Sequence, residues 1–176
     1  RNAVLEYFRK YYGPNNAVVA IAGDIDTTQI KRWADQYFAT IPAGEPYRPV
    51  VTQEPPQHGE RRIEVEYDAN PSVLIGYHVP NAVHPDAPAL RALASILTGG
   101  RTSRLVQRLV VRDRWATQVY AGQSPGSRYP RLFTFGAAPI APHTTQEIEG
   151  AIYEEIERIQ RDPPTDFEMQ RIRNAA

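Results

Sequence analysis

The chain has 176 residues, the length of one ordinary domain, and its 20 Lys plus Arg balance its 20 Asp plus Glu, so the formal net charge is zero. A nucleic-acid-binding protein normally presents a basic field, which this balance argues against. The absence of cysteine excludes disulfides and thiolate metal sites. No apolar run approaches the ~20 residues that a membrane span needs. With the charge balance arguing against nucleic acid, we expect partners among proteins, peptides and small molecules.

The first 42 residues predict a helix, a strand and a second helix. Residues 3–12 carry apolar side chains at helical spacing. The apolar run AVVAIAG, residues 17–23, is typical of a buried strand, and we expect it to pair with the sheet of later residues or with a second copy of the chain. Asp26, with Gln29 three residues later, indicates the N-cap of the second helix.

A region rich in proline and glycine, residues 43–60, indicates a linker. Beyond it, RRIEVEY at residues 61–67 alternates apolar and charged side chains, which predicts a half-exposed strand. The more evenly apolar SVLIGYHVP at residues 72–80 predicts an inner strand. Further helices are expected over 88–97 and 102–111, a hairpin over 115–123 and 131–139, and capped helices at Thr144-x-x-Glu147 and Thr165-x-x-Glu168.

This order of elements predicts an α+β fold of two layers, in which helices pack on one face of a mainly antiparallel sheet.

The stretch ILTGGRTSRL, residues 96–105, combines glycines with hydroxyls and cations, as phosphate-binding loops do. A P-loop, however, follows a strand and carries a lysine after its glycines, whereas these glycines follow a predicted helix. We therefore interpret the stretch as a structural corner. Gly99 and Gly100 end one helix in left-handed conformation, and Thr102 or Ser103 caps the next.

The remaining catalytic patterns are weak. GQSPG at residues 122–126 matches the nucleophile-elbow motif, but Pro125 follows Ser124 and has no N–H for an oxyanion hole. Glu64 and Glu66 share one side of a predicted strand, where alternating charge usually marks the solvated face.

A histidine-based metal site is also not supported by spacing. No two histidines stand four residues apart on a predicted helix, and a zinc site needs three or four protein ligands. The histidines are His58, His78, His84 and His143.

Several motifs together resemble, in the same order, the insulinase/pitrilysin (inverzincin) family of zinc metallopeptidases, in the region called the inactive domain. They are FRKYYGPNNAVVAIAGDID, YFATIPAG, PPQHGERRIEVE, LIGYHVPNAVHPDAPAL and ILTGGRTSRL, which cover nearly the whole chain.

The resemblance implies that residues 1–42 are the tail of a preceding family domain, and residues 61–176 a non-catalytic domain truncated at its C-terminus. It implies zinc in a parent protein, held by an inverted His-x-x-Glu-His motif that lies before this region. That motif does not occur in these residues, so no catalytic residue and no metal ligand is assigned here. Expected partners are the upstream zinc-bearing domain, a homologous subunit and a peptide substrate.

Family members that assist catalysis from the opposite half carry an Arg and, seven residues later, a Tyr that contact the substrate. These positions correspond to Val110 and Thr117 in this chain. Neither side chain can hold an oxyanion as that pair does. The resemblance therefore implies a supporting half of a zinc peptidase that forms a chamber wall and subunit contacts. The alternative is a family member without peptidase activity that serves in assembly. The compartment stays open, with an extracytoplasmic location favoured if the source is bacterial.

Overall fold

The computed structural model describes residues 1–46 and 54–175, and the chain forms two compact units, Arg1–Ile63 and Glu64–Ala176. Part of the predicted linker, residues 47–53, lies outside the described residues. Among the helices of the described part, none has the length and apolar character to cross a membrane.

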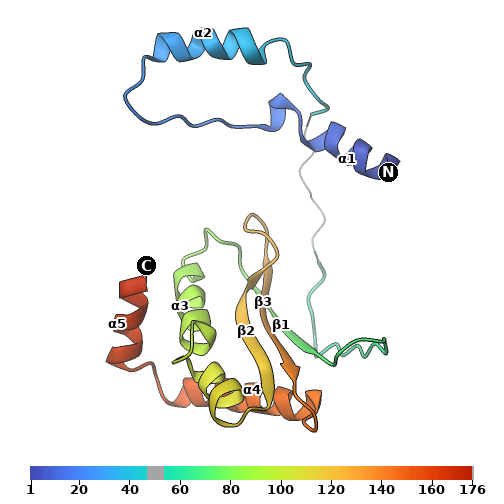
Figure 1. Ribbon diagram of the computed structural model, residues 1–176, viewed down its shortest axis with the longest axis vertical. Coiled ribbons are helices and arrows are strands. Elements are labelled where there is room, and N and C mark those ends of the chain that lie inside the picture. Colours follow the sequence, from blue (N-terminus) through green and yellow to red (C-terminus); the bar gives the residue numbers. More distant parts are fainter. Residues whose placement is uncertain (47–53, 176) are drawn as a thin grey trace. The chain divides into compact units, whose positions relative to one another are not determined.

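The first unit contains helices α1 (Asn2–Tyr11) and α2 (Thr27–Phe38) and a 3₁₀ turn over Pro14–Asn16 (Figure 1). The predicted cap of α2 is confirmed, because Asp26 Oδ1 accepts the N–H groups of Thr28 at 2.8 Å and Gln29 at 3.4 Å. The side chain of Asn15 pairs with the backbone of Gly44, accepting its N–H at 2.8 Å and donating to its carbonyl at 3.2 Å. Neither helix of this unit buries a residue.

The strand predicted over residues 17–23 is wrong, and the sheet of later residues contains no strand from them; pairing with a second copy of the chain stays a prediction. These residues form no strand, and Val18 is 98% exposed. An apolar pattern favours burial, but a strand exists only where a second strand accepts and donates its backbone hydrogen bonds. The described part of the first unit contains no such second strand.

The second unit is built on an antiparallel sheet of β1 (Val73–Val79), β2 (Ala116–Ser124) and β3 (Arg131–Pro139), in the order β1-β3-β2. The predicted hairpin is therefore confirmed as β2 and β3, and the inner strand as β1. The strand predicted over residues 61–67 is wrong: these residues form no strand, and Ile63 is 86% exposed.

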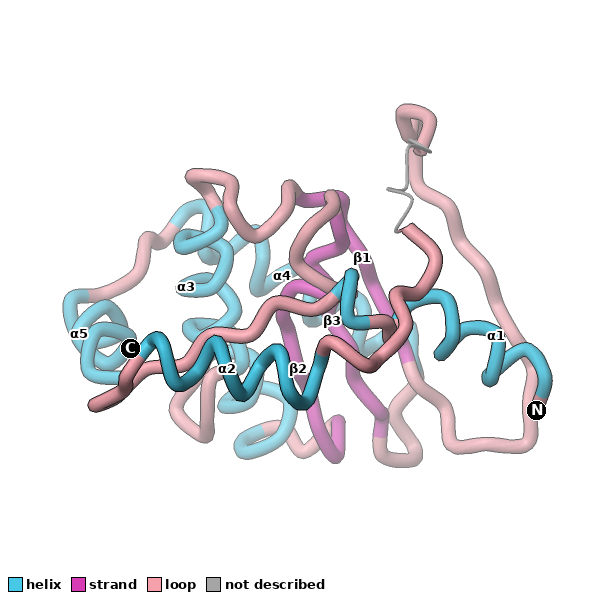
Figure 2. Tube along the Cα trace, turned by 90° about the horizontal axis from the view of Figure 1, so that it is seen from above, coloured by secondary structure: helices cyan, strands magenta, loops and turns pink. Residues whose placement is uncertain are grey.

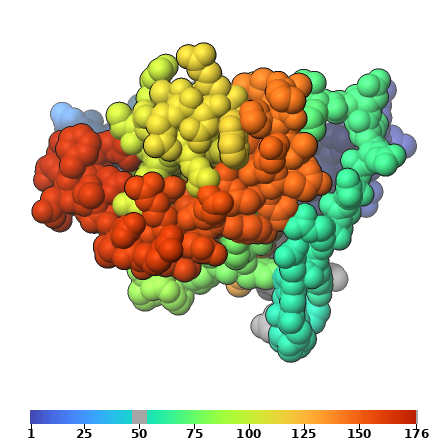
Figure 3. Space-filling model, turned by 90° about the horizontal axis from the view of Figure 1, so that it is seen from below, coloured from blue at the N-terminus to red at the C-terminus, as the bar shows by residue number. Residues whose placement is uncertain are grey.

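Helices cover one face of this sheet, which confirms the α+β architecture (Figures 1 and 2). They are α3 (Ala87–Thr98), the π-helix η2 (Val106–Arg112) and α4 (Thr145–Arg161), while α5 (Asp166–Ala175) packs against α3. The surfaces of α4 and α5, orange to red in Figure 3, lie beside the yellow segment that includes η2. The core between the layers consists of Leu97, Leu105, Leu109, Ala116, Val119, Phe133, Phe135, Ala137, Ile148, Ala151 and Ile152.

The sequence explains how these helices begin. Thr144 and Glu147 form a complete capping box at α4, with the Thr144 N–H donating to Glu147 Oε2 at 2.7 Å. Thr165 and Glu168 repeat it at α5, where the corresponding distance is 2.8 Å. The helix predicted over 102–111 is present, but its turns have the wider π register, which a hydrophobic period does not distinguish.

Among the described residues of this unit, no helix lies on the other face of the sheet. Strand alternation places Leu74, Gly136 and Tyr120 in one row across it, and Leu74 and Tyr120 are 68% and 51% exposed. The Tyr120 ring lies across Gly136, because a Cβ at Gly136 would stand 2.1 Å from Cζ of the ring. Glycine at the centre of the row thus lets an aromatic side chain lie flat on this open face.

Candidate functional site

The corner that joins α3 to η2 depends on its two glycines for different reasons. Gly100 has φ of +109°, a conformation that residues with a side chain rarely adopt. Gly99 has φ of −77°, so the left-handed conformation expected there is not found. Its constraint is steric, because a Cβ would lie 2.5 Å from the carbonyl oxygen of Ser95. That oxygen accepts the Gly99 N–H at 2.9 Å, which closes the end of α3.

The hydroxyls of the corner do not cap the next helix as expected. Ser103 Oγ donates to the carbonyl of Gly100 at 2.5 Å, and Thr102 Oγ1 accepts from Arg171 Nη1 at 2.6 Å. The helix η2 has no side-chain cap. Both hydroxyls instead fix the corner itself, one to its own backbone and the other to α5.

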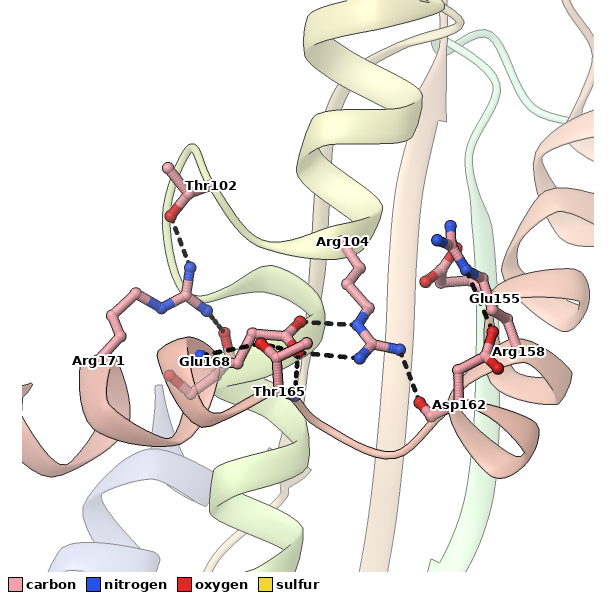
Figure 4. Close-up of polar contacts among 9 residues, drawn as sticks. Thr102, Arg104, Glu155, Arg158, Asp162, Thr165, Glu168 and Arg171 are labelled. Carbon is pink, nitrogen blue, oxygen red and sulfur yellow. Dashed lines mark hydrogen bonds and ion pairs between the residues drawn. The ribbon is translucent and has the colours of Figure 1, made fainter.

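A polar cluster of Arg104, Asp162, Thr165 and Glu168 joins this corner to the start of α5 (Figure 4). Arg104 forms a two-point ion pair with Glu168, with Nε–Oε1 at 2.7 Å and Nη2–Oε2 at 2.9 Å. Its Nη1 donates to the Asp162 carbonyl at 3.3 Å. The two side chains of the pair are only 14% and 15% exposed, so the bonds are shielded from water.

The charges of this pair are fixed at neutral pH. The hydrogen bond from Arg104 lowers the pKa of Glu168 from 4.5 to about 2, with help from the N–H and hydroxyl of Thr165 and against the opposing effect of burial. The hydrogen bond to Glu168 likewise raises the pKa of Arg104. A carboxylate so strongly ionised is a poor general base, and its guanidinium partner cannot give up a proton. The cluster is suited to holding helices together, not to proton transfer.

Arg171 makes a second tie from α5 to the corner. Its Nη2 donates to the Ser95 carbonyl at 3.0 Å, beside the bond to Thr102. Helix α5 has no buried residue, so these polar contacts are a main part of its attachment. The sequence identified Glu168 only as a capping residue. Its second partner, 64 residues earlier, and the role of Arg171 have no local sequence signal.

The structure places Val110 and Thr117 in packing and backbone roles. Val110, on η2, packs against the buried core. Thr117 stands at a bulge of β2, where the register shifts between Ala116 and Gln118, and its hydroxyl donates to the Ala138 carbonyl at 3.3 Å. Neither side chain presents a positive charge or a phenol.

The other sequence candidates do not converge on a site. Ser124 ends β2 at the hairpin, and His84 Nδ1 accepts the Asp86 N–H at 3.2 Å. His143 stacks on Trp115 with 5.0 Å between ring centroids. Within residues 1–46 and 54–175, no three His, Asp or Glu side chains are placed to hold a metal ion.

A charged cavity of about 330 Å³ lies between η2 and α4. Its charges largely pair with one another: Arg108 contacts Glu154, and Arg158 Nη1 is 3.7 Å from Glu155 Oε2. Because most of these charges are already paired, the cavity is not assigned to a charged ligand. Its lining residues are Arg108, Arg112, Glu154, Glu155, Glu157, Arg158 and Arg161.

Comparison with known proteins gives a consistent result. A family model described as the peptidase M16 inactive domain matches residues 1–176. The zinc protease PqqE of Helicobacter pylori (strain ATCC 700392 / 26695) is 26% identical over 174 residues, which cover 97% of this chain and 39% of that protein. The uncharacterized zinc protease YmxG of Bacillus subtilis (strain 168) is 23% identical over 172 residues, covering 96% and 40%. The chain thus spans about two fifths of the length of these relatives.

Solved structures share the fold. The crystal structure of a protease from Helicobacter pylori matches with a TM-score of 0.82 and 26% identity, over 97% of this chain and 42% of that one. A peptidase M16 inactive domain from Pseudomonas fluorescens matches with a TM-score of 0.67 and 20% identity, over 97% and 41%. The resemblance indicated by the motifs is therefore confirmed: the chain belongs to the peptidase M16 inactive-domain family, among the insulinase-like zinc proteases.

Proposed function

We propose that this chain is the non-catalytic part of a zinc metalloendopeptidase, in which its second unit forms a wall of the chamber where peptides are cleaved. The observation that carries the proposal is the open face of the sheet, where Leu74 and Tyr120 are exposed and no helix of the unit covers them. Apolar side chains that lie together on an exposed face are typical of an interaction site. Family membership makes a peptide the ligand that this face would meet.

We further propose that residues 1–42 belong to the domain that precedes the wall, with residues 43–60 as the linker and 61–176 as the non-catalytic domain. The absence of buried residues in α1 and α2 supports this, because helices with an apolar face are stable only when that face is covered. The relatives, of which the chain covers about two fifths, have the additional length to supply the cover. The zinc would be held in that additional part.

In this proposal the Arg and Tyr of the family come from a homologous partner subunit, since Val110 and Thr117 cannot replace them. The packed position of Val110 and the backbone bond of Thr117 support a purely structural use of both residues.

The test uses the full-length parent protein with its partner and a fluorogenic peptide. Leu74→Glu and Tyr120→Glu should lower kcat/KM at least about tenfold, because a charge on the open face would meet the apolar parts of the peptide. Gln160→Glu, an exposed position on α4, is the matched control and should have no effect. Unchanged kinetics in both open-face variants, with normal zinc content, would show that this face is not a chamber wall.

A further inference from the structure

β2 is an edge strand of the sheet, and its free side is closed by a side chain from another element. Within the described part of the chain, it pairs with β3 alone. At its middle, the N–H of Ala121 donates to Thr98 Oγ1 at 2.9 Å. Thr98 is the last residue of α3, and its hydroxyl also lies 3.2 Å from the Ala94 carbonyl and 3.4 Å from the Ala121 carbonyl. A hydroxyl thus stands where the carbonyl of a neighbouring strand would accept this N–H.

The antiparallel pairing of β2 with β3 indicates which backbone groups of β2 lie on its free edge beside this contact. Backbone groups of successive residues in a strand point alternately to its two sides. Because the Ala121 N–H points to Thr98, the N–H and carbonyl groups of Val119 and Gln123 also point away from β3. Such a row of outward backbone groups is a template on which another strand can add.

The corner positions Thr98 for this contact. The Gly99 N–H donates to the Ser95 carbonyl at the end of α3, and the Gly100 N–H donates to the Thr98 carbonyl at 2.9 Å. The chain therefore turns away immediately after Thr98. A side chain at Gly99 would collide with the Ser95 carbonyl oxygen at 2.5 Å. The two glycines therefore let a helix end against the edge of a strand.

A second feature protects the same strand. The bulge at Thr117 interrupts the register at the beginning of β2, and bulges hinder regular pairing by another strand. The bulge lies in the pairing with β3, and the bend and twist that it adds to β2 affect the free edge as well.

We propose that Thr98 guards the free edge of β2: its hydroxyl occupies the hydrogen-bonding position at Ala121 and prevents a second copy of the chain from adding a strand there. Removing the hydroxyl leaves the Ala121 N–H unbonded, so a strand from a second copy gains a hydrogen bond that it does not gain in the wild type.

The test compares Thr98→Ala, which removes the hydroxyl and leaves space beside the Ala121 N–H for a carbonyl, with Thr98→Ser, which keeps the hydroxyl. Association of residues 1–176 is measured by sedimentation velocity over a wide concentration range, with the wild type as baseline because the first unit also exposes apolar side chains. Thr98→Ala should associate about tenfold more tightly than the wild type, and Thr98→Ser should match the wild type. Equal association of all three proteins, or equal strengthening in both variants, overturns the proposal.

A second measurement tests strand addition directly and does not depend on association between two copies. A labelled peptide with the sequence of β3, RLFTFGAAP, is added to the wild type and to Thr98→Ala, because β3 is the strand that β2 already accepts. If the peptide binds Thr98→Ala at least about tenfold more tightly than the wild type, the proposal is supported. Equal binding to both proteins contradicts it.

Discussion

Replacing Arg104 with leucine removes the shielded ion pair that joins the corner to α5 while keeping the bulk of the side chain. In the folded chain the pKa of Glu168 is about 2, compared with its ordinary 4.5. At about 1.36 kcal/mol per pH unit, this difference corresponds to roughly 3 kcal/mol of preference for the charged form. Part of it comes from Thr165, whose N–H and hydroxyl remain in the variant. We therefore expect Arg104→Leu to lower the free energy of unfolding by about 1–3 kcal/mol.

The same pair predicts a pH dependence of defined sign. The folded pKa of Glu168 lies below the unfolded value, so the folded state binds fewer protons. The stabilisation is therefore complete above about pH 4.5 and is lost as the pH falls towards about 2. In Arg104→Leu this acid-dependent loss should be smaller than in the wild type.

The assay is urea unfolding followed by tryptophan fluorescence in a Trp33→Phe background, where Trp115 reports only on the second unit. Arg101→Leu is the control, because it also removes a cation from this corner. The Arg101 side chain makes no hydrogen bond or ion pair with other described residues. The control should stay within about 0.5 kcal/mol of the wild type. If Arg104→Leu is no less stable than Arg101→Leu at pH 7, the role assigned to the cluster is wrong.

Further predictions concern the corner, a helix cap and ligands of the chain. Gly100→Val should cost about 1–3 kcal/mol through strain at positive φ, whereas Gly122→Ala, where a Cβ meets open space, should cost less; urea unfolding compares them. Thr144→Ala breaks the capping box of α4 and should cost about 1 kcal/mol in the same assay. ATP or phosphate should leave the melting temperature unchanged, since the corner is structural; a clear rise would restore the phosphate-loop hypothesis.

Local sequence patterns predicted those parts of the fold that local contacts determine. The caps at Asp26, Thr144 and Thr165 depend on residues within three positions of each other, and all three form. The failed strands, 17–23 and 61–67, have equally good patterns, but a strand depends on a partner that its own sequence does not specify.

In the candidate site, too, local features could be predicted from the sequence, whereas long-range contacts could not. The glycines of the corner were recognisable because backbone turns are local. The bond from Arg104 to Glu168 and the contact of Thr98 with Ala121 connect residues 64 and 23 positions apart, and only the fold brings them together. The π register of η2 could not be predicted from the sequence either, since Leu105 and Leu109 are buried as they would be in an ordinary α-helix.

The central claim is that this chain supports, and does not itself perform, zinc-dependent peptide cleavage. The most direct measurement compares residues 1–176 with the full-length parent for bound zinc and for chelator-sensitive cleavage of a fluorogenic peptide, with and without the partner subunit. The account predicts near-stoichiometric zinc in the parent, cleavage that rises about 10²–10³-fold in kcat when the partner supplies its Arg and Tyr, and neither property in residues 1–176. Chelator-sensitive cleavage by residues 1–176 alone, or a parent that binds no zinc, would contradict it.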